Sequence, residues 1–188
     1  MIIPFIITAF VIAADQISKY IVKTNMSLYN SRTFIKHILN FYYTENDGAA
    51  WSMLRNHRWV FMSLSIVALA FMLAAIIYLG RKSLKKHNLF INISLALMFG
   101  GGAGNMIDRF TNITAQPERL GEGTKVVVDF LQFDFWQKFP VFNLADSFIC
   151  IGSVLFCVCI FTGKYKMPKL PDLFKRKINI SEDNQDNI

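Results

Sequence analysis

The chain contains little cysteine and little histidine, the residues that most often bind zinc or complete a nucleophilic catalytic site. It has three cysteines and three histidines in 188 residues. Cys150, Cys157 and Cys159 all lie in the last apolar segment without CxxC spacing, which is typical of small apolar helix residues. The histidines occur singly, and no HExxH pattern is present. The sequence therefore predicts no disulfide framework, no zinc site and no Ser-His-Asp or Cys-His catalytic site.

The first apolar stretch also lacks the features of a cleavable signal peptide. No basic region precedes it, and no clear small-x-small cleavage site follows it. We therefore interpret it as a permanent membrane span. No internal repeat is visible along the chain, which argues against a fold built from repeated halves.

Apolar sequence is what the chain has in abundance, with 53% hydrophobic and 14% aromatic residues. Four apolar segments each approach the roughly 20 residues that cross the hydrocarbon of a bilayer. They lie at about 2–22, 59–79, 89–107 and 141–162. The predicted fold class is an all-α membrane protein, with four transmembrane helices in a domain of residues 1–163 and a small extracytoplasmic β platform. Residues 164–188 are predicted to be a basic and polar cytoplasmic tail.

The formal net charge of +7 fits a membrane topology better than nucleic-acid binding. The basic residues cluster beside apolar segments, at 81–86 and from Lys164 onward. Because cytoplasmic loops are enriched in Lys and Arg, we expect both termini and the 81–86 link on the cytoplasmic side of a bacterial inner membrane. Loops 24–57 and 109–140 then share the outer surface, and no nucleic-acid partner is expected.

Ionisable side chains inside apolar spans are costly and suggest functional sites. Asp15 and Lys19 have the i,i+4 spacing of a structural ion pair, with Lys19 extending outward, although contact with a substrate is an alternative. Asn105, Asp108 and Arg109 share one helix face at the end of the third span. Asp108 and Arg109 could simply end the span as interfacial charges, whereas Asn105, one turn deeper, is placed to orient a carboxylate or a bound carbonyl.

A second polar stretch precedes the second span. Residues 34–43 alternate in the manner of a strand. The sequence Asn46-Asp47-Gly48 predicts a turn in which Gly48 adopts a positive φ. This stretch is either a plain interfacial loop or a strand-and-turn platform that holds an extended peptide by main-chain hydrogen bonds.

Two carboxylates suggest the chemistry. Asp129 follows the strand-like residues 126–128, and Asp146 lies three residues after Asn143, a spacing that puts both on one face of a helix. An acid near a helix N-terminus is also favourable without any function. Two carboxylates held close together share a proton, so one can activate water while the other polarises a carbonyl, without a metal or cofactor. The pair titrates as a unit, and the sequence does not assign one role to each.

Five polar motifs in this order resemble those of the lipoprotein signal peptidases (signal peptidase II), membrane aspartyl proteases of bacteria. The resemblance extends from about residue 10 to 162. The motifs are DQISK at 15–19, NDGAAWS at 46–52, GNMIDR at 104–109, VVDF at 127–130 and FNLADS at 142–147.

The resemblance implies that Asp129 and Asp146 are the catalytic aspartates. The implied supporting residues are Asp15, Lys19, Asn46, Gly48, Asn105, Asp108, Arg109 and Asn143. The implied substrate is a prolipoprotein whose cysteine carries diacylglycerol, cut just before that cysteine. Segment 111–125 is longer than in many relatives and Trp51 stands where Phe is more usual, so these departures concern substrate preference rather than chemistry.

Two other functions are alternatives to an intramembrane aspartyl endopeptidase. A proton- or ion-coupled carrier would be expected to show repeated halves and polar residues at the bilayer midplane, whereas the polar residues here gather on one side. A non-enzymatic membrane scaffold gives no reason for Asn105 and the two acids. We therefore predict the endopeptidase, working as a monomer among membrane lipids.

Overall fold

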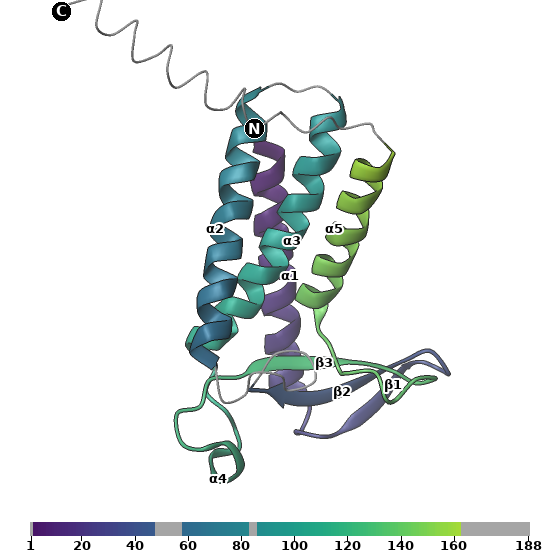
Figure 1. Ribbon diagram of the computed structural model, residues 1–188. Helices are drawn as coiled ribbons and strands as arrows, with labels where there is room; N and C mark the ends of the chain where they lie inside the picture. The colour runs from purple at the N-terminus through teal and green to yellow at the C-terminus, as the bar shows by residue number, and fades with distance from the viewer. Residues whose placement is uncertain (1, 48–57, 83–85, 163–188) are drawn as a thin grey trace, which may run out of the picture.

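The computed structural model describes residues 2–47, 58–82 and 86–162. Four long helices form a bundle, and a small sheet lies across one end of it (Figure 1). The helices are α1 (Ile2–Asn25), α2 (Arg58–Lys82), α3 (Lys86–Thr111) and α5 (Leu144–Phe161). All four contain stretches long and apolar enough to cross a membrane. The predicted four-span fold with a small β platform is confirmed.

The helix ends differ from the predicted spans where the sequence is polar. The third helix continues to Thr111 and not only to 107, so Asn105 and Asp108 lie within regular helix and Arg109 lies in its last turn. Their side chains are largely buried against the rest of the molecule, so the helix continues through them. The last helix begins at Leu144 and not at 141, because Asn143 caps it.

Helix α3 lies at the centre of the bundle and packs against α1, α2 and α5. A Cβ atom added to Gly101 would lie 2.4 Å from the carbonyl oxygen of Ala145 in α5. A Cβ atom added to Gly100 would lie 2.8 Å from the Cβ of Val11 in α1. Both distances are shorter than any ordinary contact, so only glycine allows these helices to approach so closely. The glycine run therefore serves helix packing.

The platform is an antiparallel sheet in the order β1-β2-β3. Its strands are β1 (Ser31–Ile35), β2 (Leu39–Asn46) and β3 (Val127–Phe133). Thus β3 confirms the predicted strand around 126–130, but a single strand over 34–43 is wrong. Residues 36–38 form a turn instead, because His37 adopts φ 64°, a left-handed conformation that a strand excludes.

A shared apolar core fixes the platform to the ends of the helices. Val22 of α1 packs with Tyr43 of β2 and with Val128 and Phe130 of β3, and Leu144 of α5 adjoins this cluster. The platform therefore rests directly on the helix bundle.

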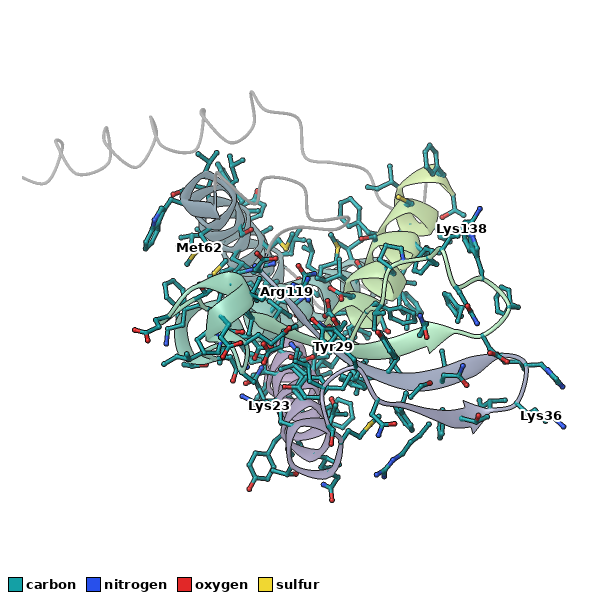
Figure 2. The ribbon with its side chains drawn as sticks, turned by 90° about the horizontal axis from the view of Figure 1, so that it is seen from below. Lys23, Tyr29, Lys36, Met62, Arg119 and Lys138 are labelled. Atoms are coloured by element: carbon teal, nitrogen blue, oxygen red, sulfur yellow. The ribbon has the colours of Figure 1, made fainter. Side chains whose placement is uncertain are left out.

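Residues 112–125, which contain the one-turn helix α4 (Pro117–Leu120), form an arm between α3 and β3. The carboxylate of Glu45 in β2 accepts hydrogen bonds from the Thr114 hydroxyl at 2.6 Å and from the Ala115 N–H at 3.0 Å. At the arm's far end, Arg119 donates to the Tyr29 hydroxyl, and the two residues lie near each other in the view from below (Figure 2). The turn predicted at Gly48, the Trp51 position and the tail from 164 lie outside the described residues.

Candidate active site

Asn143 connects the two predicted catalytic acids. It is the N-cap of α5, where its side-chain oxygen accepts from the Asp146 N–H at 2.9 Å and its own N–H donates to Asp146 Oδ2 at 3.2 Å. Its Nδ2 donates to Asp129 Oδ1 at 2.7 Å. The three-residue spacing therefore forms a capping box, and not the shared helix face expected from the sequence. One buried side chain holds both acids in place.

Asp129 lies on β3, where it is 2% exposed. Its second oxygen accepts from Asn46 Nδ2 on the neighbouring strand at 3.0 Å. Burial, reinforced by the negative charge of Asp146, raises the pKa of Asp129 to about 7, although hydrogen bonds from Asn46 and Asn143 act in the opposite direction. Near neutral pH this carboxyl group therefore exchanges a proton readily.

Asp146 is held from α3 as well as from its own helix. Asn105 Nδ2 donates to Asp146 Oδ1 at 2.7 Å. The oxygen of the same amide accepts from Lys19 Nζ at 2.9 Å and from Asn143 Nδ2 at 3.0 Å. An ammonium group can only donate, so Lys19 fixes which end of the Asn105 amide faces Asp146.

A charged cluster lies behind Asn105. Lys19 forms ion pairs with Asp15 at 2.7 Å and with Asp108 at 2.9 Å. Asp15 also accepts from the Ala145 N–H at 3.0 Å, so the cluster joins α1, α3 and α5. The predicted ion pair between Asp15 and Lys19 is present. The expectation that Lys19 extends outward is wrong, because the side chain is 3% exposed and its two acid partners hold it inside the bundle.

A cavity of about 800 Å³ opens beside the acids, between α2, α3, α5 and the platform. Its polar end includes Asn46, Asn105, Arg109, Asp129 and Asp146. The remaining lining is mostly apolar. It includes Leu69 and Met72 of α2, Met98 of α3, Ile149 and Ile151 of α5, and the aromatic rings of Phe133 and Phe139. The site thus combines a small polar end with a larger apolar space.

The structure sorts the predicted supporting residues into two groups. Asn46, Asn105 and Arg109 line the cavity, and Asn143 holds the acids from behind. Asp15, Lys19 and Asp108 are absent from the cavity lining, which favours the structural interpretation of the ion pair over substrate contact. Gly48 lies outside the described residues.

Residue-by-residue reasoning missed two contributors. Gln16 donates to Asp108 Oδ1 at 3.0 Å and to the Gly104 carbonyl at 3.1 Å, which links α1 to α3. The sequence signal that could have indicated this role is the position of Gln16 inside an apolar span, next to Asp15. Glu45 fastens the arm, but nothing in the local sequence indicates a partner almost 70 residues away.

No group of three or more His, Cys, Asp or Glu side chains that could hold a metal ion occurs in the part of the chain that the structure describes. The predicted independence of metals and cofactors stays a prediction. The acids and amides at the polar end of the cavity could bind a water molecule and a peptide carbonyl between them.

Comparison with known proteins gives a consistent result. Residues 7–162 match the sequence model of a family described as signal peptidase (SPase) II. The chain is 37% identical to a lipoprotein signal peptidase of Listeria monocytogenes over 164 residues, which are 86% of this chain and 95% of that relative.

Two solved structures, both described as bacterial membrane enzymes, have similar folds. One gives a TM-score of 0.66 at 32% identity and covers 89% of this chain and 93% of its own. The other gives a TM-score of 0.63 at 33% identity and covers 84% and 91%, respectively.

Proposed function

The chain belongs to the signal peptidase II family, and from this premise we propose that it is an aspartic endopeptidase whose catalytic residues are Asp129 and Asp146. Membership makes the chain a membrane peptidase that removes signal peptides from prolipoproteins. The aspartic mechanism and the residue roles are our proposal.

One observation carries the proposal. Two acids from different elements, β3 and α5, line the same cavity and are both hydrogen-bonded to Asn143. A purely structural N-terminal acid on α5 would need no second carboxylate nearby. The raised pKa of Asp129 supports a pair that carries one proton near neutral pH.

In the proposed reaction, a water molecule lies between the pair and the scissile carbonyl. The ionised carboxylate takes a proton from this water as its oxygen attacks the carbonyl carbon, and the protonated carboxyl group donates its proton to the carbonyl oxygen. The tetrahedral diol then collapses. The C–N bond breaks as the protonated acid gives its proton to the leaving nitrogen and one diol hydroxyl gives its proton to the ionised acid, which returns the pair to its one-proton state.

The surrounding amides position these groups. Asn105 and Asn46 donate to the two carboxylates, and neither amide titrates at neutral pH. Arg109 lines the same end of the cavity and has a rigid set of donors suited to holding a carbonyl or carboxylate. Gly48 remains a proposed member of this shell from its motif alone.

The cavity also supports a lipid-bearing substrate. Its apolar part lies between α2 and α5, at depths within the membrane spans. We propose that it accepts the diacylglycerol on the substrate cysteine, with cleavage just before that residue. We further propose an inner-membrane location with the site near the outer face, and a monomeric enzyme.

The decisive test is cleavage of a diacylglyceryl-modified prolipoprotein by purified protein, followed as a gel shift. Asp129→Asn and Asp146→Asn should each abolish cleavage, because Asn is nearly isosteric but can neither accept nor deliver the shared proton. Each variant should still extract as a folded protein with its own melting transition. EDTA in the same assay should leave wild-type turnover unchanged.

Normal turnover by either variant would refute the aspartate pair. Loss of activity in EDTA that zinc restores would refute the metal-free mechanism.

A further inference from the structure

Outside the four long helices, the exposed large hydrophobic side chains of the described residues gather mostly at one edge of the platform. Phe34, Ile38, Phe135 and Trp136 are each more than half exposed, and Ile35 is 44% exposed. They come from the end of β1, from the β1–β2 turn and from the loop that follows β3. We call this edge, residues 34–38 together with 135–138, the aromatic lip.

Hydrogen bonds and ring packing hold the two parts of the lip in a fixed arrangement. The Asp134 N–H donates to the Ile38 carbonyl at 3.0 Å, which joins the turn to the loop. Asn40 donates to the Asp134 carboxylate at 3.0 Å across the same junction. Trp136 packs on Phe139 with ring centroids 5.1 Å apart, and Phe139 also lines the cavity. The lip therefore has a defined geometry next to the candidate site.

A bilayer spanned by α5 would place the lip at the depth of the lipid headgroups. Helix α5 has 18 residues, so it is about 27 Å long and matches the hydrocarbon thickness. The platform meets the start of this helix directly, because Phe142 exchanges backbone hydrogen bonds with Leu131 of β3. In Figure 1 the β1–β2 end of the sheet extends past α5 to the side of the bundle. Lipids beside α5 would therefore meet the face of this overhang that is turned toward the helices.

The charges at the lip are basic. Lys36 lies at the hairpin turn and Lys138 in the facing loop, and both side chains are exposed. Figure 2 shows these two lysines at the same side of the molecule, away from Lys23 and Arg119. The acid at the junction, Asp134, is engaged by Asn40. Aromatic rings beside exposed lysines are typical of an interface with anionic lipid.

We propose that the aromatic lip is a binding site for anionic phospholipid headgroups of the leaflet that the platform covers. Phe34, Phe135 and Trp136 enter the interface, and Lys36 and Lys138 contact the lipid phosphates. This interaction would keep the platform level on the membrane beside the cavity. It goes beyond the peptidase reaction and does not depend on it.

The test uses Trp136 as a fluorescent reporter in lipid nanodiscs. Trp51→Phe and Trp59→Phe leave Trp136 as the single tryptophan in the full chain. Phosphatidylglycerol and phosphatidylcholine with brominated chains are then compared as quenchers, with iodide as the aqueous quencher. We expect strong quenching by both lipids, weak quenching by iodide, and a preference for phosphatidylglycerol that falls as salt rises.

Removal of the two lysines should reduce that preference. Each basic residue near an anionic surface contributes about a fivefold preference at low salt. The double change Lys36→Gln and Lys138→Gln should therefore lower the relative binding constant for phosphatidylglycerol by one order of magnitude or more. The double change Lys23→Gln and Arg119→Gln removes the same charge away from the lip and should leave the preference unchanged.

Four outcomes would overturn the proposal. The first is quenching of Trp136 by iodide and not by brominated lipid. The second is equal quenching by the two lipids, and the third is a preference that both double variants reduce equally. The fourth is lipid-insensitive emission that changes only when prolipoprotein is added, which would make the lip a protein-contact surface. If the single-tryptophan chain does not fold, the difference between wild type and Trp136→Phe gives the same measurement.

Discussion

At the scale of single residues, the proton on Asp129 gives the clearest prediction. The folded protein holds this proton up to a pH of about 7, whereas an unfolded aspartate loses it near pH 3.9. Between these values the folded state binds more protons, so the free energy of unfolding must fall as pH rises through this window. Below the window both states are protonated and no stability has been lost, and above it the loss of stability is complete.

The Asp129→Asn variant should therefore become more stable relative to wild type as the pH rises. The new amide has a fixed cost, because its N–H groups face the donors of Asn46 and Asn143. That cost does not vary with pH, so the melting temperature of the variant minus that of wild type should rise between about pH 4 and pH 7. Thermal melts across this range measure the difference. A difference that stays flat or falls with pH would contradict the raised pKa. Wild-type kcat should also fall above about pH 7, as the shared proton is lost.

The supporting amides should behave differently from the acids. Asn105→Ala, Arg109→Ala and Asn143→Ala each remove a positioning donor from a water-poor site, which typically costs about a hundred- to a thousandfold in rate. These variants should be slow but measurable in the gel-shift assay, whereas the acid variants should be inactive. Complete inactivity of Asn105→Ala in a folded protein would mean that its role is chemical.

Asp15 tests the charged cluster behind the site. Its carboxylate joins Lys19 to the start of α5, so Asp15→Ala leaves a buried ammonium with one partner fewer. We expect a lower melting temperature and lower yield, with turnover per folded molecule largely kept. A variant that melts normally but does not turn over would place Asp15 among the residues that act on the substrate.

At the scale of elements, neighbouring glycines in α3 provide a matched pair of substitutions. A Cβ on Gly101 meets the Ala145 carbonyl at 2.4 Å, and this backbone cannot move without shifting α5. A Cβ on Gly102 meets only the end of the Leu69 side chain at 2.9 Å, which can rotate away. Gly101→Ala should therefore lower both the melting temperature and turnover, while Gly102→Ala should change both much less. Equal effects of the two substitutions on turnover would show that the spacing between α3 and α5 does not control the positions of the two acids.

The elements also show what the sequence could predict. The spans, the strand before Asp129 and the acid pair were predictable, because apolar length and polar residues inside apolar runs are local signals. The hairpin turn at His37 was missed, because no glycine or proline indicates it. The direction of the Lys19 side chain was also mispredicted. An ion pair with Asp15 alone would suit a lysine that extends toward the membrane surface. The second acid, Asp108, comes from α3, so only the packing of α3 against α1 holds Lys19 inside the bundle. Such long-range contacts leave no mark in the local pattern.

At the scale of the whole molecule, orientation is the remaining prediction. The density of basic residues at 81–86 predicts that a reporter fused there, or after residue 164, reports the cytoplasm. A reporter within 111–125 should report the outer side. Activity of paired alkaline phosphatase and fluorescent-protein fusions measures both positions. The reverse pattern would place the candidate site on the cytoplasmic face and contradict processing of exported proteins.

The capping box of α5 has a consequence for how the molecule moves as it works. The backbone N–H of Asn143 is held by the carboxylate of Asp146, the group that the proposed reaction protonates and deprotonates. Whenever the shared proton passes to Asp146, this acceptor weakens and the first turn of α5 loosens, to tighten again when the proton leaves. On this mechanism, the beginning of the last span would flex as the proton moves. Faster amide exchange at 143–146 during turnover than at rest would test this coupling.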